Sequence, residues 1–343
     1  MRPEGTGGAP RVSVVMVVFN GERYVEEAIQ SIRAQRFENF EFIIIDDGST
    51  DRTGEILDSF RTQDSRIVVK KQPNSGIAAA RNQACALARA PYVACIDADD
   101  VATPARLALQ VSYLDAYPDI GVLGGGVMLV DESGNDLWIE SYPLTHEEIV
   151  AAFERFCPFV HSTVMMRRSL LDAVNHYRTL FEQYEDFDLW LRMSERTQLA
   201  NLSDVLARYR LHSGQSTSQM LPRQALGCLV ARTAWRARRA GAVDPTEASS
   251  VISAELLADL GIAPADVARE EVTLGLWYAK TIRAAGDDHW RRIWWATLKA
   301  ARFDRQLMWR VLAYRLGLWR RKLRAGFAAY TRQRSAGRAG GEQ

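Results

Sequence analysis

The N-terminal third of the chain alternates between two hydrophobic patterns, and this alternation limits the possible folds more than any other feature. Runs of apolar, often β-branched residues predict buried strands at residues 12–19, 40–45, 67–69 and 92–96. Helical spacing of apolar residues predicts helices at residues 22–35, 51–60 and 76–90. Strands that alternate with helices form βαβ units, so we expect an α/β fold with a mostly parallel sheet flanked by helices.

Beyond residue 118 the pattern loosens and then becomes helical. A strand at 120–130 followed by a turn at 131–136 indicates a hairpin, and Thr145 with Glu148 predicts a capping box for the next helix, to about residue 156. We expect a strand at 160–166, a helix at 184–193 and an extended segment at 202–211. After Gly214 the sequence predicts only helices.

These patterns suggest four segments, with a boundary near residue 220. We expect a flexible N-terminus at residues 1–10, an α/β domain at 11–220, a helical region at 221–333 and a flexible tail at 334–343. The first segment is rich in Gly and Pro and resembles neither a signal peptide nor a membrane anchor. The longest apolar run, residues 12–19, is too short to span a bilayer.

Charge and cysteine content suggest where the protein works. Residues 289–338 hold fourteen Lys and Arg, five of the nine Trp and a single acid, Asp304, whereas the front of the chain is balanced. The four cysteines form no CxxC pair, and three lie in apolar settings. We therefore expect reduced cysteines in a cytoplasmic protein, and the charge asymmetry suggests different partners for its two halves.

Acidic residues follow the fourth predicted strand, as Asp97-Ala98-Asp99-Asp100. If the strand geometry continues, Asp97 and Asp99 point to the same side, and carboxylate oxygens suit Mg²⁺ or Mn²⁺ held together with substrate phosphates. The alternative is helix capping, but Thr103 and Pro104 already form a suitable N-cap and first helical position. The cluster is an equally good candidate for a metal site and for an ordinary acidic loop.

Asp46 and Asp47 end the second predicted strand, where ligands of open α/β sheets bind. A carboxylate there can accept hydrogen bonds from a ribose or a base, whereas residues 49–51 after it are better explained as caps of the next helix. No GxGxxG follows the first strand and no GxxxxGK[ST] is present, so neither a Rossmann nor a P-loop site is predicted.

Glu185, Asp186 and His212 have both a structural and a functional interpretation. Acids are favoured in the first turn of a helix, but a carboxylate near an acceptor hydroxyl can also act as a general base. His212 follows a predicted strand and could bind metal or phosphate, although a histidine there is more often structural.

Six motifs together resemble the family 2 glycosyltransferases of the GT-A fold. They are the run from Val12 to Asn20, Ile44-Ile45-Asp46-Asp47-Gly48-Ser49-Thr50-Asp51, Asn74-Ser75-Gly76 with Ala80-Arg81-Asn82, Asp97-Ala98-Asp99-Asp100, Glu185-Asp186-Phe187-Asp188-Leu189-Trp190-Leu191-Arg192, and Tyr209-Arg210-Leu211-His212 with Ser216 and Ser218. Their order and spacing make the resemblance specific. It covers roughly residues 10–218 and does not extend into the helical region.

The resemblance implies a role for each of these residues. Phe19, Glu22 and Asp47 would contact the base and ribose of a nucleotide sugar, with Gly76 and Arg81 lining the same pocket. Asp97 would face the ribose or the ion, Asp99 would bind Mn²⁺ or Mg²⁺ directly, and His212 would help to hold the metal or the diphosphate. Asp186 would be the catalytic base with Glu185 beside it. His161 is equally consistent with contact to the acceptor and with burial in the sheet.

The activity implied is transfer of a sugar with inversion, from a UDP-sugar in the usual case, to a saccharide or lipid-linked acceptor. Processive synthases of this family carry QxxRW and transmembrane helices, whereas this chain has Gln306-Leu307-Met308-Trp309-Arg310. We therefore expect transfer of one or a few sugars. A non-catalytic nucleotide-sugar-binding protein is an alternative, and a haloacid-dehalogenase-like phosphatase is a weaker one, because the DxDx[TV] match follows the fourth strand instead of the first.

The helical region carries an amphipathic stripe. Its apolar members are Trp309, Leu312, Leu316, Trp319, Leu323 and Phe327, with arginines and a lysine beside them. Such a stripe fits peripheral docking on the cytoplasmic face of a membrane, and it fits equally well packing against the catalytic domain or a second subunit. No nucleic-acid-binding motif accompanies the charge, so we expect no nucleic-acid partner.

Overall fold

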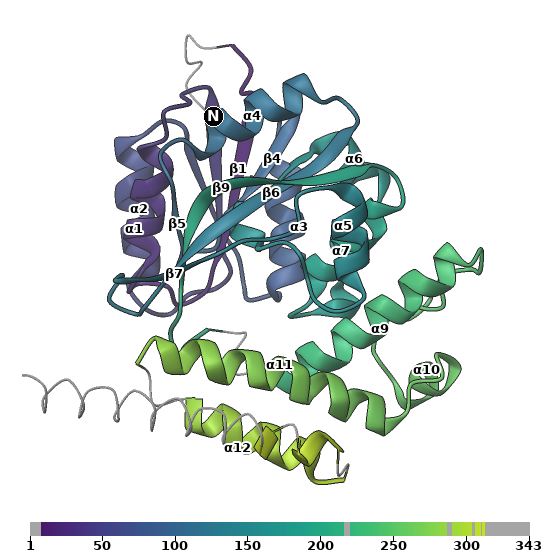
Figure 1. The fold of residues 1–343 in the computed structure, drawn as a ribbon. Helices are drawn as coiled ribbons and strands as arrows, with labels where there is room; N and C mark the ends of the chain where they lie inside the picture. The colour runs from purple at the N-terminus through teal and green to yellow at the C-terminus, as the bar shows by residue number, and fades with distance from the viewer. Residues whose placement is uncertain (1–7, 216–219, 287–289, 304–305, 310, 313–343) are drawn as a thin grey trace, which may run out of the picture.

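The computed structural model describes residues 8–215, 220–286, 290–303, 306–309 and 311–312 (Figure 1). The predicted alternation of strands and helices in the front of the chain is confirmed. Its elements are β1 (Val12–Val18), α1 (Val25–Arg33), β2 (Phe40–Asp46), α2 (Thr53–Gln63), β3 (Ile67–Lys71), α3 (Ile77–Leu87) and β4 (Tyr92–Cys95).

The second group of elements adds antiparallel strands and further helices. These are β5 (Val101–Ala102), α4 (Arg106–Ala116), β6 (Ile120–Val130), β7 (Asp136–Glu140), α5 (His146–Phe153), η1 (His161–Thr163), β8 (Met165–Arg167), α6 (Arg168–Ala173), η2 (Thr179–Phe181), α7 (Glu185–Ser194) and β9 (Gln198–Arg210). The predicted hairpin is present as β6 and β7, and the capping box of Thr145 and Glu148 starts α5.

Among the described residues, nine strands form one sheet in the order β3-β2-β1-β4-β8-β6-β9-β5, with β7 paired to β6. Strands β3, β2, β1 and β4 are parallel, as expected from their βαβ connections, whereas β8 is antiparallel to both of its neighbours. The carboxyl ends of β1, β2 and β4 therefore meet at one edge of the sheet, where the polar motifs begin.

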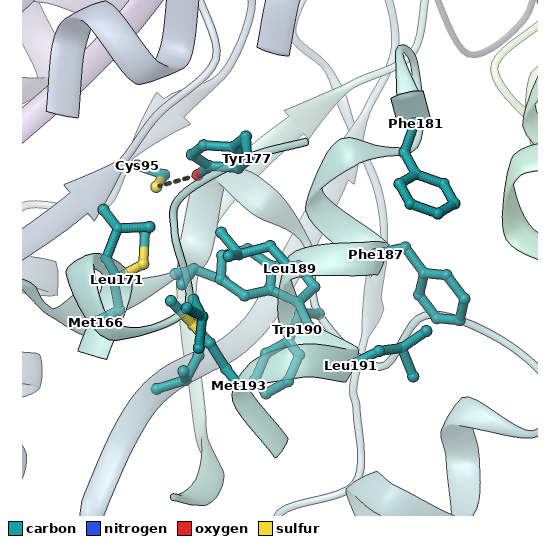
Figure 2. Packing of buried hydrophobic residues seen from close by; sticks show 14 of the residues in the cluster. Cys95, Met166, Leu171, Tyr177, Phe181, Phe187, Leu189, Trp190, Leu191 and Met193 are labelled. Carbon is teal, nitrogen blue, oxygen red and sulfur yellow. Dashed lines mark hydrogen bonds between the residues drawn. The ribbon is translucent and has the colours of Figure 1, made fainter. Parts of the chain in front are cut away.

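Both faces of β1, β2 and β4 are buried, which explains their apolar sequences, whereas the edge strand β3 is only partly buried. On β1, Val14 and Met16 pack in a cluster with α1, α2 and α4, whereas Val15 packs on the other face with α3, α5 and α7. Figure 2 shows part of the second cluster, including Trp190 and Phe187 of α7. Helix α7 is thus fixed against the sheet by its own buried face.

The C-terminal helices are α9 (Leu221–Arg239), α10 (Ala254–Asp259), α11 (Pro264–Ala284) and α12 (Trp290–Ala300), followed by η3 (Ala301–Phe303). They do not form a core apart from the sheet. Cys228 and Trp235 of α9 belong to the same buried cluster as α7, and α11 and α12 pack with Leu129 of β6 and Ala207 of β9 (Figure 1). In the part of the chain that the structure describes, no helix has the length and apolarity needed to cross a bilayer.

Two local predictions are wrong. Thr103 is not an N-cap, because α4 begins at Arg106; instead the Thr103 hydroxyl donates to the carbonyls of Val205 and Leu206 on β9. The strand expected at 160–166 is mostly a 3₁₀ turn, with β8 starting only at Met165. The expected tail, residues 334–343, and most of the amphipathic stripe, from residue 313 on, lie outside the described residues, as does most of the predicted flexible N-terminus.

Candidate active site

The end of β2 is held to the loop before α3 by Asp47. Its Oδ1 accepts hydrogen bonds from Gln72 Nε2 at 2.8 Å and from the backbone N and side-chain Oγ of Ser75 at 3.0 Å each, and its Oδ2 accepts from Gly76 N at 3.2 Å. Asp47 is buried, as a carboxylate with four such donors can be. It therefore shapes the loop that the sequence assigns to donor binding.

Phe19 and Glu22 follow β1 at the same edge. The Phe19 side chain is 52% exposed, which is unusual for a large aromatic residue at the end of a buried strand. Glu22 Oε2 accepts from Arg52 N at 2.9 Å, and Asp51 accepts from Glu22 N at 3.1 Å, so the loops after β1 and β2 cap each other. Of residues 49–51, which were expected to cap the next helix, only Asp51 accepts from the start of α2, at Thr53 N, whereas the N-cap position is Arg52 and the Ser49 hydroxyl accepts from Asn20 N.

Arg81 of α3 joins two of the predicted site carboxylates. Its Nη2 lies 3.0 Å from Asp97 Oδ1, and its Nη1 donates to Glu185 Oε1. The guanidinium and Glu185 are both buried, so this ion pair is shielded from water and leaving Glu185 without Arg81 is costly, whereas Asp97 is partly exposed. Arg81 thus ties the loop after β4 to the start of α7.

Asp97 lies beyond the end of β4, which stops at Cys95, so the alternation of side chains along a strand does not determine where Asp97 and Asp99 point. Several hydrogen-bond donors surround the Asp97 carboxylate. Besides Arg81 it contacts His161 Nδ1 at 3.1 Å and Ser162 Oγ at 3.2 Å. Burial alone would raise the pKa of Asp97, but cationic His161 and Arg81 hold it well below its usual range.

His161 is buried in the turn η1 and has a protein partner at each ring nitrogen. Nδ1 contacts Asp97, and Nε2 lies 3.3 Å from the hydroxyl of Tyr177, which in turn contacts Cys95 Sγ at 3.7 Å (Figure 2). Burial and Arg81 lower the pKa of His161, but these effects are outweighed, with the charge and hydrogen bond of Asp97 contributing to a net rise to about 10. No sequence motif pointed to Tyr177, which is a lone aromatic residue in a loop.

Asp99 and His212 form a second pair at the same edge. His212 Nε2 lies 2.9 Å from Asp99 Oδ2, and the imidazole packs on Tyr24 with ring centroids 4.8 Å apart. Arg210 Nε donates to Asp99 O, and Arg210 N donates to Asp100 Oδ1 at 2.9 Å, so Asp100 supports the end of β9. Burial raises the pKa of Asp100 well above its usual range, with neighbouring Asp99 and Asp97 adding to the shift.

The site offers few residues for a metal ion. Within the described ranges no group of three or more His, Cys, Asp or Glu side chains is arranged to hold one. Asp97 is engaged by Arg81, His161 and Ser162, whereas the pair of Asp99 and His212 offers a partly exposed carboxylate and an imidazole. Carboxylate and imidazole suit a divalent ion that takes its other ligands from phosphate and water.

Glu185 and Asp186 open α7 with different environments. Glu185 is 2% exposed and is committed to Arg81, and burial raises its pKa to about 7 against the opposing effect of Arg81. Asp186 is partly exposed. The two adjacent acids are therefore not equivalent: Asp186 is the more exposed of the two, and its Oδ1 accepts from Phe187 N at 2.6 Å.

Comparison with known proteins agrees with this geometry. The family model described as "Glycosyl transferase family 2" matches residues 13–174. An uncharacterized glycosyltransferase of Methanocaldococcus jannaschii is 31% identical over 67% of this chain and 81% of that protein. The Bacillus subtilis protein named as glycosyltransferase EpsE is 35% identical over 59% of this chain and 73% of that protein.

Solved structures show the same fold. The Staphylococcus aureus protein TarS in complex with UDP-GlcNAc is 19% identical, with a TM-score of 0.52 over 82% of this chain and 90% of that one. The mannosyltransferase PcManGT of Pyrobaculum calidifontis, in complex with GDP-Man and Mn²⁺, is 18% identical, with a TM-score of 0.54 over 90% of this chain and 86% of that one. A dehalogenase-like phosphatase fits neither the family match nor the position of the acidic loop after β4. The chain belongs to the family 2 glycosyltransferases and is a glycosyltransferase enzyme with the GT-A fold.

Proposed function

We propose that the protein is an inverting, metal-dependent glycosyltransferase that moves a sugar from a nucleoside-diphosphate sugar, with UDP-sugars favoured, to a hydroxyl of a saccharide or lipid-linked acceptor. The observation that carries the proposal is the convergence of four motifs, far apart in sequence, at one edge of the sheet. Arg81 joins Asp97 to Glu185, while Asp99 pairs with His212.

In this proposal the donor lies across the carboxyl ends of β1, β2 and β4. Phe19, Glu22 and Asp47 contact base and ribose, and Gly76, Arg81 and Asp97 line the same pocket. The exposure of Phe19 supports a stacking role, because an aromatic ring left uncovered at a strand end can cover a base. The bound UDP-GlcNAc and GDP-Man of the two structural neighbours motivate a nucleotide-sugar donor.

The reaction is a single displacement. Asp186 accepts the proton of the acceptor hydroxyl, the oxygen forms a bond to the anomeric carbon, and the bond from that carbon to the diphosphate oxygen breaks with its electron pair on the nucleoside diphosphate. From an α-linked donor the product is β-linked. Glu185, paired with Arg81, fixes the helix start that presents Asp186.

Asp99 and His212 would hold Mn²⁺ or Mg²⁺, with Asp97 shared between the ion and the ribose. A cation held by these residues would supply positive charge to stabilise the departing diphosphate. For the acceptor side we keep His161 as a candidate, although its ring nitrogens contact Asp97 and Tyr177.

The acceptor class is proposed from relatives. WbnJ of Escherichia coli is named as an O-antigen biosynthesis glycosyltransferase and is 29% identical over 61% of this chain and 83% of that protein. We infer a role in surface polysaccharide or glycoconjugate synthesis. The replacement of QxxRW by Gln306-Leu307-Met308-Trp309-Arg310 supports transfer of one or a few sugars.

We also propose peripheral contact with the cytoplasmic face of a membrane through α12. Arg292, Trp295 and Lys299 are exposed at spacings of three and four residues, and residues 290–303 contain no acid. We call these three residues the basic face of α12. Cations around an exposed tryptophan suit a surface of anionic lipid.

The test is a panel of UDP- and GDP-sugars incubated with the full chain and Mn²⁺, with nucleoside diphosphate release as the readout. One donor should be consumed, and consumption should stop when the metal is chelated. A non-catalytic nucleotide-sugar-binding protein would instead be stabilised thermally by a donor that it never consumes. That outcome would overturn the proposed transfer.

A further inference from the structure

The N-terminus of α3 is capped by a residue from the segment that leads into the catalytic helix. Glu182 Oε1 accepts from Ile77 N at 2.7 Å, and its Oε2 lies 3.5 Å from Ala78 N. The N-cap residue itself, Gly76, has no side chain to satisfy these donors, which every helix start leaves unpaired. A carboxylate from 105 residues away in sequence supplies the cap.

Gly76 makes this approach possible. A Cβ there would lie 2.8 Å from Glu182 Oε1, and the residue has φ of +86°, in the left-handed region that favours glycine. The neighbouring N–H groups of Ser75 and Gly76 go to Asp47. The loop before α3 is therefore held by Asp47 at the end of β2 and by Glu182 in the segment before α7.

The segment around Glu182 is a tight turn. Tyr184 N donates to Phe181 O at 2.7 Å, Glu182 has φ −46° and ψ 126°, and Gln183 has φ +76°. These angles are those of a type II turn, whose third position favours Gly or Asn. A glutamine in that position is strained, so the turn depends on contacts at its ends.

Two such contacts reach the same helix. Glu182 binds the first turn of α3, and Glu185, three residues later, binds Arg81 on the next turn of α3. Phe181, at the start of the turn, is buried in the cluster shown in Figure 2. Asp186 follows directly, so its position depends on a turn clamped between α3 and this cluster.

We propose that Glu182 is a positioning residue, which clamps the turn Phe181–Tyr184 onto the N-terminus of α3 and so sets Asp186 relative to the donor-binding loop. The inference rests on the proposed role of Asp186 as the base. Without the clamp Gln183 relaxes toward negative φ, and the start of α7 shifts. Because Asp47 still holds Gly76, donor affinity changes little while turnover falls.

The test compares Glu182→Ala and Glu182→Gln with Glu148→Ala, a matched control that removes a capping glutamate from the exposed start of α5. We expect Glu182→Ala to lower kcat at least tenfold with donor KM within threefold, and Glu182→Gln to recover part of kcat, because its carbonyl oxygen can still accept from Ile77 N. Glu148→Ala should keep the kcat of the unmodified chain.

Hydrogen exchange of the full chain provides a readout that needs no donor. In Glu182→Ala the amides of residues 181–186 should exchange at least tenfold faster than in the unmodified chain. In Glu148→Ala their exchange rates should not change. Unchanged exchange, or an unchanged kcat in Glu182→Ala when Asp186→Asn is inactive, would overturn the clamp and leave the proposed function standing. Full activity of Asp186→Asn would instead overturn the base assignment on which the clamp rests.

Discussion

The strand-rich part of the molecule and its C-terminal helices use charge in opposite ways. In the former, buried and half-buried charges are paired with one another across long sequence distances, as Arg81 is with Asp97 and Glu185. In α12, arginines and a lysine lie exposed on a segment without acids. Paired buried charges fix the geometry of a site, whereas an excess of one sign on a surface attracts a partner of the other sign.

The comparison also divides the C-terminal helices themselves. Helix α9 supports α7, since Trp235 packs edge-on against Phe153 and donates from Nε1 to Ser194 Oγ at the end of α7. Helix α12 packs on α11 (Figure 1). The buried side of α9 should therefore matter more for the stability of α7 than the exposed face of α12 does.

The largest effect is expected in the strand-rich part, from Asp186→Asn. Loss of a general base lowers rates by about 10² to 10⁴-fold, so kcat should fall within that range. Binding of UDP or GDP, measured by thermal shift, should stay unchanged. Asp119→Asn, an exposed aspartate before β6, is the control and should keep full activity. An equal loss of kcat in both variants would show that Asp186 has no special role as a base.

The next largest effect tests whether the packing of α9 stabilises α7. Trp235 is fully buried, and truncating a buried tryptophan costs about 3 to 5 kcal/mol of unfolding free energy. Trp235→Ala should therefore lower the denaturation midpoint strongly, with activity lost as α7 loosens. Trp295→Ala, at a side chain that is 57% exposed, should leave the midpoint almost unchanged. Similar midpoints for the two variants would show that α9 is not part of the core.

Metal dependence tests whether Asp99 and His212 hold a divalent ion. Chelation by EDTA should abolish turnover, and Asp99→Ala should weaken donor binding in Mn²⁺ by about tenfold or more, since a bound cation contributes several kcal/mol of charge stabilisation. Without added metal, the affinities of the variant and the unmodified chain should converge. A variant with unchanged affinity in Mn²⁺ would remove Asp99 from the metal site.

The smallest effect concerns the basic face of α12. A triple variant should bind less to vesicles that contain phosphatidylglycerol, because each cation near an anionic surface contributes about 1 kcal/mol. It combines Arg292→Glu, Trp295→Ala and Lys299→Glu. Catalytic turnover of a soluble acceptor should not change. Arg61→Glu with Lys70→Glu, at exposed positions of the strand-rich part, is the control. If both sets bind vesicles equally, α12 is not the contact.

The sequence predicted the strands well where burial on both faces makes them continuous apolar runs, as in β1 and β2. It failed where a distant partner decides the local structure. Thr103 resembles a helix cap, but its hydroxyl binds β9, and the apolar run near residue 160 becomes a turn in which His161 and Ser162 bind Asp97. Glu182 gave no signal, because its partner, the start of α3, lies 105 residues away.

The central claim is that this edge of the sheet transfers a sugar with inversion, using Asp186 as the base. Proton NMR of the sugar first released from the α-linked donor that the panel identifies tests it directly, because the anomeric proton reports the configuration before it equilibrates. The account predicts the β-anomer first from the unmodified chain and no release from Asp186→Asn. Release of the α-anomer first, or equal release from Asp186→Asn, would contradict it.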